Sequence, residues 1–264
     1  MYRFLFTPRW LAFHLLVVAG VVLMVNLGFW QLRRLDERRE FNATVESRID
    51  LPPVPLDDVL VPGADPEDLE WRSVTASGTY LPEETFVVVN RSQGGVAGEM
   101  VVTPMELDDG RILLVERGFV PLDAEAAPPP AGTVEVTGRL RPSQTRRTGQ
   151  LSDPATGELT EAQRIDIDRL APQLPGEPVP MFLELTSSDP AEPGPSPQPV
   201  TAPELSDGPH LSYAVQWFIF STAVVVGWVL AVRKSITTRR RAAARAAAGA
   251  GATAADEPAP TSSG

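Results

Sequence analysis

Two long apolar runs, one near each end of the chain, constrain the fold more than any other feature of the sequence. They extend from Trp10 to Leu32 and from Leu211 to Val232, and neither contains Asp, Glu, Lys or Arg. At a helical rise of ~1.5 Å per residue, a run of this length covers roughly 33 Å, which is enough to cross a hydrocarbon core of ~30 Å. The runs therefore predict two transmembrane helices.

A cleaved signal peptide is the alternative interpretation of the first run. Signal peptides have a shorter apolar region that ends in small residues at the cleavage site. This run instead ends in Phe29, Trp30 and Gln31, which favours a retained anchor.

The charged residues divide the chain into basic ends and an acidic middle. The formal net charge is -11, and of the 34 acidic residues only Asp256 and Glu257 lie outside the segment between the two runs. Eight cations flank the runs on their terminal sides: Arg3, Arg9, Arg233, Lys234, Arg239, Arg240, Arg241 and Arg245. Because cationic flanks favour the cytoplasmic side, we expect both termini in the cytoplasm, the middle outside it, and a location in the cell membrane. Arginines also follow the first run, but a loop this long counts little in that rule.

The composition excludes several kinds of site. The chain has no cysteine, which rules out disulfides, Cys-based zinc or copper sites and a Cys nucleophile. Its two histidines, His14 and His210, lie in or beside the apolar runs, so a hydrolytic triad in the middle segment would lack its imidazole. Paired carboxylates stay open as a catalytic alternative, although a solvated acidic surface is the favoured explanation. Since an acidic body also lacks the basic stripe that nucleic acid requires, we predict neither an enzyme nor a nucleic-acid-binding protein.

The segment between the runs predicts a β-rich domain behind a helical extension. Residues 33–50 contain no helix breaker before Pro52, and Arg33 and Glu37 lie at helical spacing. Asp109-Gly110 between two apolar runs is a strong hairpin signal. Short strands without long helices between them predict a mainly antiparallel α+β domain, a small barrel or sandwich, flanked by the two transmembrane helices. The β-type runs are 71–80, 85–90, 99–107, 111–116, 133–141 and 179–185, with a short helix expected at 165–174.

These features predict a division of the chain into seven segments. Pro-rich composition before the second run predicts a semi-rigid spacer. The Ala-, Gly- and Ser-rich tail is expected to be mostly disordered, with a short basic helix on the membrane surface as an option for its first part. The segments are a cytoplasmic N-terminus (1–9), a transmembrane helix (10–32), a helical extension (33–50), an extracytoplasmic β-rich domain (51–188), a Pro-rich linker (189–209), a second transmembrane helix (211–232) and a basic cytoplasmic tail (233–264).

Aromatic and histidine side chains gather at the expected outer ends of the two spans. Trp30 closes the first span, and His210, Tyr213 and Trp217 share one face of the second at i, i+3 and i+7. One interpretation is an interfacial aromatic belt. The other is a haem site, because imidazole is a common axial ligand and aromatic faces pack against a porphyrin. His14 is not expected to be a second axial ligand, since it lies about 25–30 Å away by helix rise.

Four stretches of the chain have the order and content of known family motifs. They are Leu27 to Arg34, Leu69 to Tyr80, Gly98 to Pro121, and His210 to Phe218. In these stretches the chain resembles the surfeit-locus (SURF) family of cytochrome c oxidase assembly proteins. Two departures are visible, since Glu116 stands where the family usually has Asn and the Pro-rich segment is longer.

The resemblance implies an assembly factor for the haem–copper cytochrome c oxidase that helps to receive haem a or insert it into the catalytic subunit. It implies His210 as the candidate haem ligand. The residues that accompany it could instead pack between the two spans. Arg33 and Arg34 are suited to pair with haem propionates, and contact with lipid headgroups is their alternative role. The accompanying candidates are Trp217, Tyr213, Gln216 and Trp30.

Partners follow from the same resemblance. We expect the oxidase catalytic subunit and the lipid bilayer, and further haem a synthase and a respiratory supercomplex. A cofactor-free membrane scaffold that binds oxidase or supercomplex subunits is the main alternative. An unrelated envelope protein, such as a cell-wall binding module, is a third.

Overall fold

The computed structural model of the protein describes residues 2–61 and 63–255, which fall into two compact units. The helical unit comprises Met1–Phe41 and Ser206–Gly264, and the β unit comprises Asn42–Leu205. Each unit has its own set of internal contacts.

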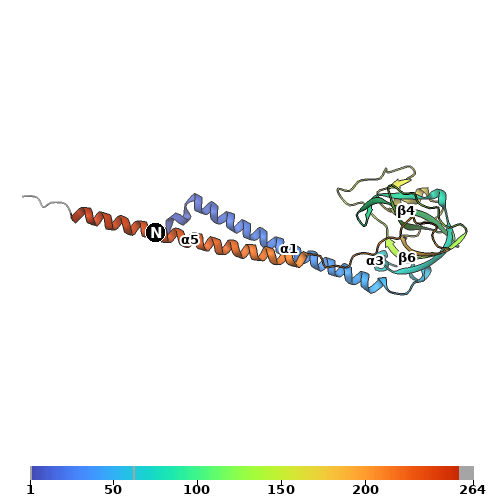
Figure 1. The fold of residues 1–264 in the computed structure, drawn as a ribbon, viewed down its shortest axis with the longest axis horizontal. Coiled ribbons are helices and arrows are strands. Elements are labelled where there is room, and N and C mark those ends of the chain that lie inside the picture. Colours follow the sequence, from blue (N-terminus) through green and yellow to red (C-terminus); the bar gives the residue numbers. More distant parts are fainter. Residues whose placement is uncertain (1, 62, 256–264) are drawn as a thin grey trace, which may run out of the picture. The chain divides into compact units, whose positions relative to one another are not determined.

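Two long helices make up most of the helical unit (Figure 1). They are α1 (Pro8–Ile49) and α5 (His210–Ala255), and a short 3-10 helix, η1 (Arg3–Phe6), precedes α1. Both are long and apolar enough to cross a membrane, and only 6% of the most apolar stretch of each is buried. Two apolar helices thus flank the β unit in the sequence, as the sequence analysis predicts.

The less exposed residues of α1 and α5 recur with the spacing of a coiled coil. A series of them lies three or four residues apart, with one step of seven between Ser221 and Trp228, so that one face of each helix is turned toward the other. Along α1 this series is His14, Val17, Val21, Met24, Gly28, Gln31 and Leu35, and along α5 it is His210, Ala214, Trp217, Ser221, Trp228, Ala231 and Ser235.

Contacts at both ends of the pair show one constant antiparallel register. Gln31 bonds to His210 and Trp228 bonds to His14, and the residue numbers of each pair add up to 241 or 242. Between them, a Cβ on Gly28 would come within 2.8 Å of the ring of Phe218. A side chain at this position would force the Phe218 ring or the helix to shift, so glycine favours this close approach of the two helices.

The second helix does not end with its apolar run. α5 continues to Ala255, so the expectation of a mostly disordered tail is wrong for residues 233–255. The alanines and arginines of this stretch have high intrinsic helix propensity, which explains the continuation. Residues 256–264 of that expected tail lie outside the described residues.

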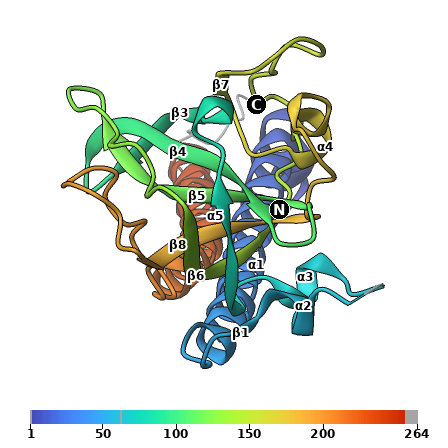
Figure 2. The same ribbon diagram turned by 90° about the vertical axis from the view of Figure 1, so that its right-hand side faces the viewer.

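The β unit is built on a closed barrel of five strands, β2, β6, β8, β5 and β4, in which β2 also pairs with β4. Figure 2 shows β4, β5, β6 and β8 side by side. Neighbouring strands of the barrel are antiparallel, with the exception of the parallel pair β5 and β8. The sheet is extended beyond the barrel by β3, β7 and β1. The strands are β1 (Val54–Pro55), β2 (Ser73–Tyr80), β3 (Phe86–Gln93), β4 (Val96–Leu107), β5 (Ile112–Pro121), β6 (Thr133–Pro142), β7 (Glu161–Ala162) and β8 (Met181–Asp189). Short helices lie between them: α2 (Leu56–Val59), α3 (Pro66–Leu69), η2 (Pro82–Glu84), α4 (Ile167–Leu170) and η3 (Ala171–Gln173).

Strand alternation gives this barrel two separate hydrophobic cores. Leu113 and Val115 of β5 belong to the cluster inside the barrel, while Leu114 between them belongs to a second cluster. The second cluster also contains Ile167 of α4 and Phe182 of β8. The segment around α4 therefore packs on the outer face of the barrel.

The Pro-rich segment after β8 is folded onto the β unit, which corrects the expectation of a spacer for this part of the chain. Gln198 exchanges two backbone hydrogen bonds of 2.8 Å with Phe119, and Ala127 N donates to Ser196 O at 2.9 Å. A Cβ on Gly118 would lie 2.2 Å from the Gln198 oxygen, so glycine is required for this approach. The composition gave no sign of this pairing, because its partner strand is far away in the sequence.

Candidate functional site at the end of the helix pair

His210 begins α5 and faces Gln31 of α1 across the helix pair. The imidazole Nδ1 lies 2.9 Å from the Gln31 carbonyl oxygen, Oε1. Because a carbonyl oxygen only accepts, Nδ1 carries the hydrogen and donates it. The other ring nitrogen, Nε2, then keeps its lone pair, which is the form of imidazole that binds a metal ion.

Space beside this nitrogen is provided by Gly208. The residue has a φ of 66°, in the left-handed region that favours glycine. A Cβ at this position would lie 3.5 Å from Cδ2 and 3.6 Å from Nε2 of His210. The lack of a side chain therefore leaves room next to the atom that has the free lone pair.

Ionic and hydrogen-bond contacts hold the segment before His210 along α1. Arg39 pairs with Asp207 at 2.9 Å, and Arg38 donates to the Ser206 carbonyl oxygen at 3.0 Å. The Arg39 and Asp207 side chains are about half exposed, so each contact is weak in free energy. Together they fix where α5 begins relative to Gln31.

His14, the other histidine, has the opposite arrangement near the far end of the pair. The indole nitrogen of Trp228 donates to His14 Nδ1 at 2.8 Å. An indole N–H cannot accept, so Nδ1 is unprotonated and the hydrogen of this imidazole is on Nε2. The Nε2 atom of His14 is therefore a hydrogen-bond donor, whereas the Nε2 atom of His210 has a free lone pair. Of the two histidines, only His210 is arranged as a metal ligand would be.

The remaining residues of the predicted site differ in placement. Trp217 is half-buried and meets Phe220 edge to face at 6.2 Å. Tyr213 and Trp30 are 48% and 47% exposed, and Gln216 is exposed as well. The structure thus pairs His210 with Gln31, which the sequence analysis did not include among the site residues.

The residues at this end fit a haem. A neutral imidazole whose Nδ1–H is held by an oxygen acceptor is the usual arrangement of a histidine metal ligand, and exposed aromatic faces suit the macrocycle. In the described part of the chain, no group of three His, Asp or Glu residues offers an alternative metal site. His210 is the residue that would contact the iron.

Comparison with known proteins gives the family. Residues 18–222 match the SURF1 family. The chain belongs to the SURF1 family. The match begins within the apolar part of α1 and ends within that of α5, so it includes Gln31, His210 and the β unit.

Several SURF1 relatives align with much of this chain. An uncharacterized SURF1-like protein of Mycobacterium tuberculosis is 33% identical over 247 residues, which cover 90% of this chain and 89% of the relative. A SURF1-like protein of Monosiga brevicollis is 28% identical over 81% of this chain and 85% of its own length. The cytochrome oxidase assembly protein SHY1 of Saccharomyces cerevisiae is 34% identical over 106 residues, which cover 40% of this chain and 27% of that protein.

The β unit of this SURF1 chain contains a buried carboxylate that the sequence analysis noted only as a departure from the family motif. Glu116 on β5 is 9% exposed and is the register partner of Glu184 on β8. Burial, followed by the negative charge of Glu184, raises the pKa of Glu116 to about 7, although Arg141 and Arg91 act in the opposite direction. Glu184 pairs with Arg139 at 2.7 Å. The signal available in the sequence was a glutamate directly after the apolar run Ile112–Val115.

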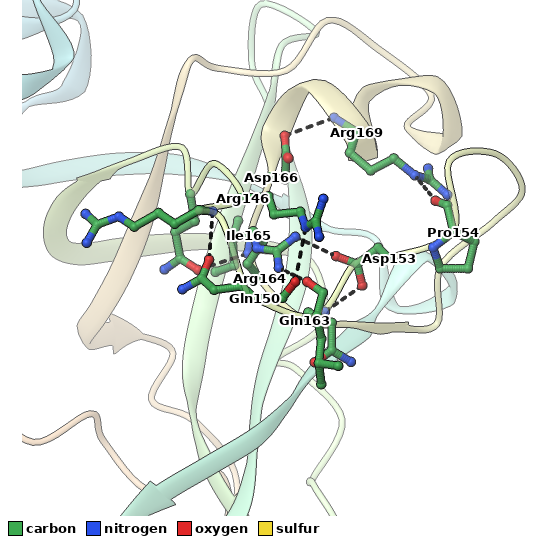
Figure 3. Close-up of polar contacts among 12 residues, drawn as sticks. Arg146, Gln150, Asp153, Pro154, Gln163, Arg164, Ile165, Asp166 and Arg169 are labelled. Carbon is green, nitrogen blue, oxygen red and sulfur yellow. Dashed lines mark hydrogen bonds and ion pairs between the residues drawn. The ribbon is translucent and has the colours of Figure 1, made fainter.

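A second polar cluster ties the segment between β6 and α4 together (Figure 3). The Arg164 guanidinium donates to Asp153 and to the Leu151 carbonyl oxygen, while Asp153 also accepts from the backbone N–H of Gln163. Arg169 donates to the carbonyl oxygens of Pro154 and Gly157. These bonds mostly satisfy backbone groups of an irregular segment, so the cluster has a structural role in this SURF1 chain.

Proposed function

We propose that this chain is a membrane-anchored assembly factor for the haem–copper cytochrome c oxidase that helps to receive haem a or to insert it into the catalytic subunit. Membership of the SURF1 family and the similarity to the yeast cytochrome oxidase assembly protein SHY1 support the oxidase assembly part. The haem part rests on a single observation: the Nδ1–H of His210 donates to Gln31, which leaves the lone pair of Nε2 free.

Each residue at this end of the helix pair has a role in the proposal. His210 binds through Nε2, and Gln31 keeps the ring in the ligating tautomer and orientation. Trp30, Tyr213 and Trp217 lie on or beside the same end of the helices and pack against an apolar macrocycle. When bound, the haem would supply the iron centre that the oxidase requires, and His210 is the residue that would hold it.

The proposal includes the orientation of the chain in the cell membrane. The long apolar helices, with 6% of their most apolar stretches buried, support insertion. The eight cations at the terminal sides of the apolar runs support two cytoplasmic termini, with the β unit outside the cytoplasm. The catalytic subunit is the primary partner, and haem a synthase and a respiratory supercomplex are further partners. The chain is proposed to act without an enzymatic step of its own.

The haem part is tested by spectroscopy on the purified full chain, produced together with the enzymes of haem a synthesis. The wild type is expected to show a Soret band, and His210→Ala to lose most of it. His14→Ala is the matched control and should keep the band, because its imidazole is arranged as a donor rather than as a ligand. A wild-type protein without Soret absorbance would remove the haem part of the proposal.

A cofactor-free scaffold is the second candidate, and the large β unit supports it. No histidine lies in the β unit, and its described residues include no group suited to a metal, so its surface is available for protein contacts. A scaffold would retain oxidase subunits in a pull-down, and His210→Ala would leave the cellular oxidase level unchanged. A lower oxidase level in His210→Ala membranes, with the variant chain present in normal amount, would favour the haem role.

A further inference from the structure

The N-terminal residues and the last part of α5 are held together in the helical unit. Arg240 Nη2 lies 3.2 Å from the Tyr2 hydroxyl oxygen, and the Arg239 guanidinium lies over the Phe4 ring at 4.2 Å. Phe4 in turn meets Trp10 edge to face at 5.5 Å. These contacts follow the register of the helix pair, so cations from both ends of the chain are brought to one end of the unit.

The cations of this end have no carboxylates near them in the sequence. No Asp or Glu occurs from Met1 to Leu35 or from Gly208 to Ala255. Every one of the cations is exposed to solvent: Arg3, Arg9, Arg233, Lys234, Arg239, Arg240, Arg241 and Arg245. The end therefore has a strong positive field that its own helices do not compensate.

The cations form two tiers along the helices. Arg9, Arg233 and Lys234 directly adjoin the apolar runs. The second tier, centred on Arg239–Arg241, lies six to eight residues further along α5, or about 9–12 Å by helix rise. The headgroup region on each side of a bilayer is roughly 5–8 Å thick, and the Debye length in physiological salt is ~8 Å. The first tier thus lies at the level of the phosphates, and the second lies where the potential of an anionic surface still acts.

Aromatic side chains accompany the cations at the same level. Tyr2 and Phe6 are 50% and 72% exposed, beside the half-buried Trp10. Exposed aromatic rings next to cations are typical of segments that lie at a membrane interface.

We infer that this cationic end binds the phosphate headgroups of anionic phospholipids, with the second tier providing the preference for anionic over zwitterionic lipid. The inference rests on the proposed membrane insertion. A lipid is favoured over nucleic acid because the first tier adjoins the apolar run and because aromatic rings intervene between the cations. The tail is then a continuation of α5 that stands at the membrane surface, instead of a separate helix lying on it.

The test measures lipids retained by the purified full chain in detergent micelles that contain equal amounts of phosphatidylglycerol and phosphatidylcholine. Native mass spectrometry counts each lipid on the protein. The wild type is expected to retain phosphatidylglycerol over phosphatidylcholine by about tenfold, given the attraction of each cation near an anionic surface. Arg239→Gln/Arg240→Gln/Arg241→Gln is expected to remove most of this preference.

A matched control carries the same change in charge elsewhere. Arg72→Gln/Arg146→Gln/Arg147→Gln, all in the β unit, should retain the wild-type lipid ratio. An unchanged ratio in the second-tier variant, or an equal loss in both variants, would overturn the inference. So would binding of poly(U) RNA that is lost in the second-tier variant while lipid retention is unaffected. The measurement needs neither haem nor oxidase, so failure of the haem proposal leaves its outcome unchanged.

Discussion

The two histidines of the chain are distinguished by their hydrogen-bond partners rather than by their neighbours in sequence. An amide oxygen takes the Nδ1 hydrogen of His210, whereas an indole N–H occupies Nδ1 of His14. The same ring therefore presents a free Nε2 lone pair in one place and acts as a helix–helix hydrogen-bond acceptor in the other. A single partner residue, Gln31 or Trp228, decides between the two.

The first prediction at this scale concerns Gln31. Gln31→Leu keeps the approximate volume of the side chain but removes the acceptor for the His210 Nδ1–H. Haem retention, measured as the Soret absorbance per protein, is expected to fall by roughly 10- to 100-fold, the usual effect of losing such a partner. Asn26→Leu is the control and should behave as the wild type, since Asn26 is exposed on the same helix and donates to the Val22 carbonyl oxygen of that helix. Equal retention in both variants would show that the hydrogen bond does not position the ligand.

The second prediction at this scale concerns Glu116. Its pKa in the folded protein is raised from 4.5 to about 7, so the folded state binds more protons than the unfolded state between these two values. Stability from this group is fully present below about pH 4.5 and falls as the pH rises to about 7. The full effect is on the order of 3 kcal/mol.

Glu116→Gln tests this pH dependence because it removes the titration and keeps the shape. At pH 8 the variant is expected to unfold at higher denaturant concentration than the wild type, whereas at pH 4.5 the difference should shrink. Trp71 is the single tryptophan of the β unit, and its fluorescence reports the transition. Glu116→Asn also removes the titrating group and should give the same sign. A wild type whose stability rises between pH 5 and pH 7.5 by more than that of both variants would contradict the prediction.

At the scale of elements, local sequence patterns were sufficient to predict the strands but not the closure of the barrel. Alternating and β-branched runs marked the strands of the barrel, and Asp109-Gly110 marked the hairpin between β4 and β5. The pairing of β2 with β4, which closes the barrel, depends on contacts between distant segments and has no local signal. For the same reason, the composition of the Pro-rich segment predicted a spacer, although Gln198 pairs with Phe119.

The candidate site was predictable to a similar extent. His210 and Trp30 were found from the motifs at the ends of the two runs. The hydrogen bond that defines the ligand joins residues 179 positions apart, and it needs the antiparallel register of α1 and α5. Sequence patterns gave the faces of the helices but not that register.

The prediction at this scale uses the close approach of the helices. In Gly28→Ala the new Cβ would lie 2.8 Å from the Phe218 ring, so either the ring or the helices must shift. Gly20→Ala in the same helix is the matched control, since nothing lies within 4 Å of its Cβ position. In detergent, the control is expected to be as stable as the wild type or slightly more stable, by up to about 1 kcal/mol.

Gly28→Ala is expected to lower the melting temperature of the helical unit, followed by the fluorescence of its tryptophans, and to weaken haem retention through Gln31 and His210. A Gly28→Ala protein as stable as Gly20→Ala would mean that the helices do not pack at this position in solution.

At the scale of the whole molecule, the charges and the apolar surface are separated along the chain. The acidic residues lie almost entirely between the apolar runs, while the cations of the terminal segments are uncompensated. Such a chain has a large electrostatic preference for one orientation across a membrane that carries an anionic cytoplasmic surface. In the proposed orientation, His210 lies at the outer ends of the two spans.

The absence of cysteine makes this orientation directly testable. Ala126→Cys places one thiol in an exposed loop of the β unit, and Ala246→Cys places one on the exposed surface of α5 beyond the cationic tiers. A membrane-impermeant maleimide is expected to label Ala126→Cys in intact cells from which the outer layers have been removed. It should label Ala246→Cys only after the membrane is permeabilised. The reverse labelling pattern would mean that the orientation across the membrane is opposite to the proposed one, with His210 at the cytoplasmic surface. Labelling of both thiols without permeabilisation would rule out two membrane crossings.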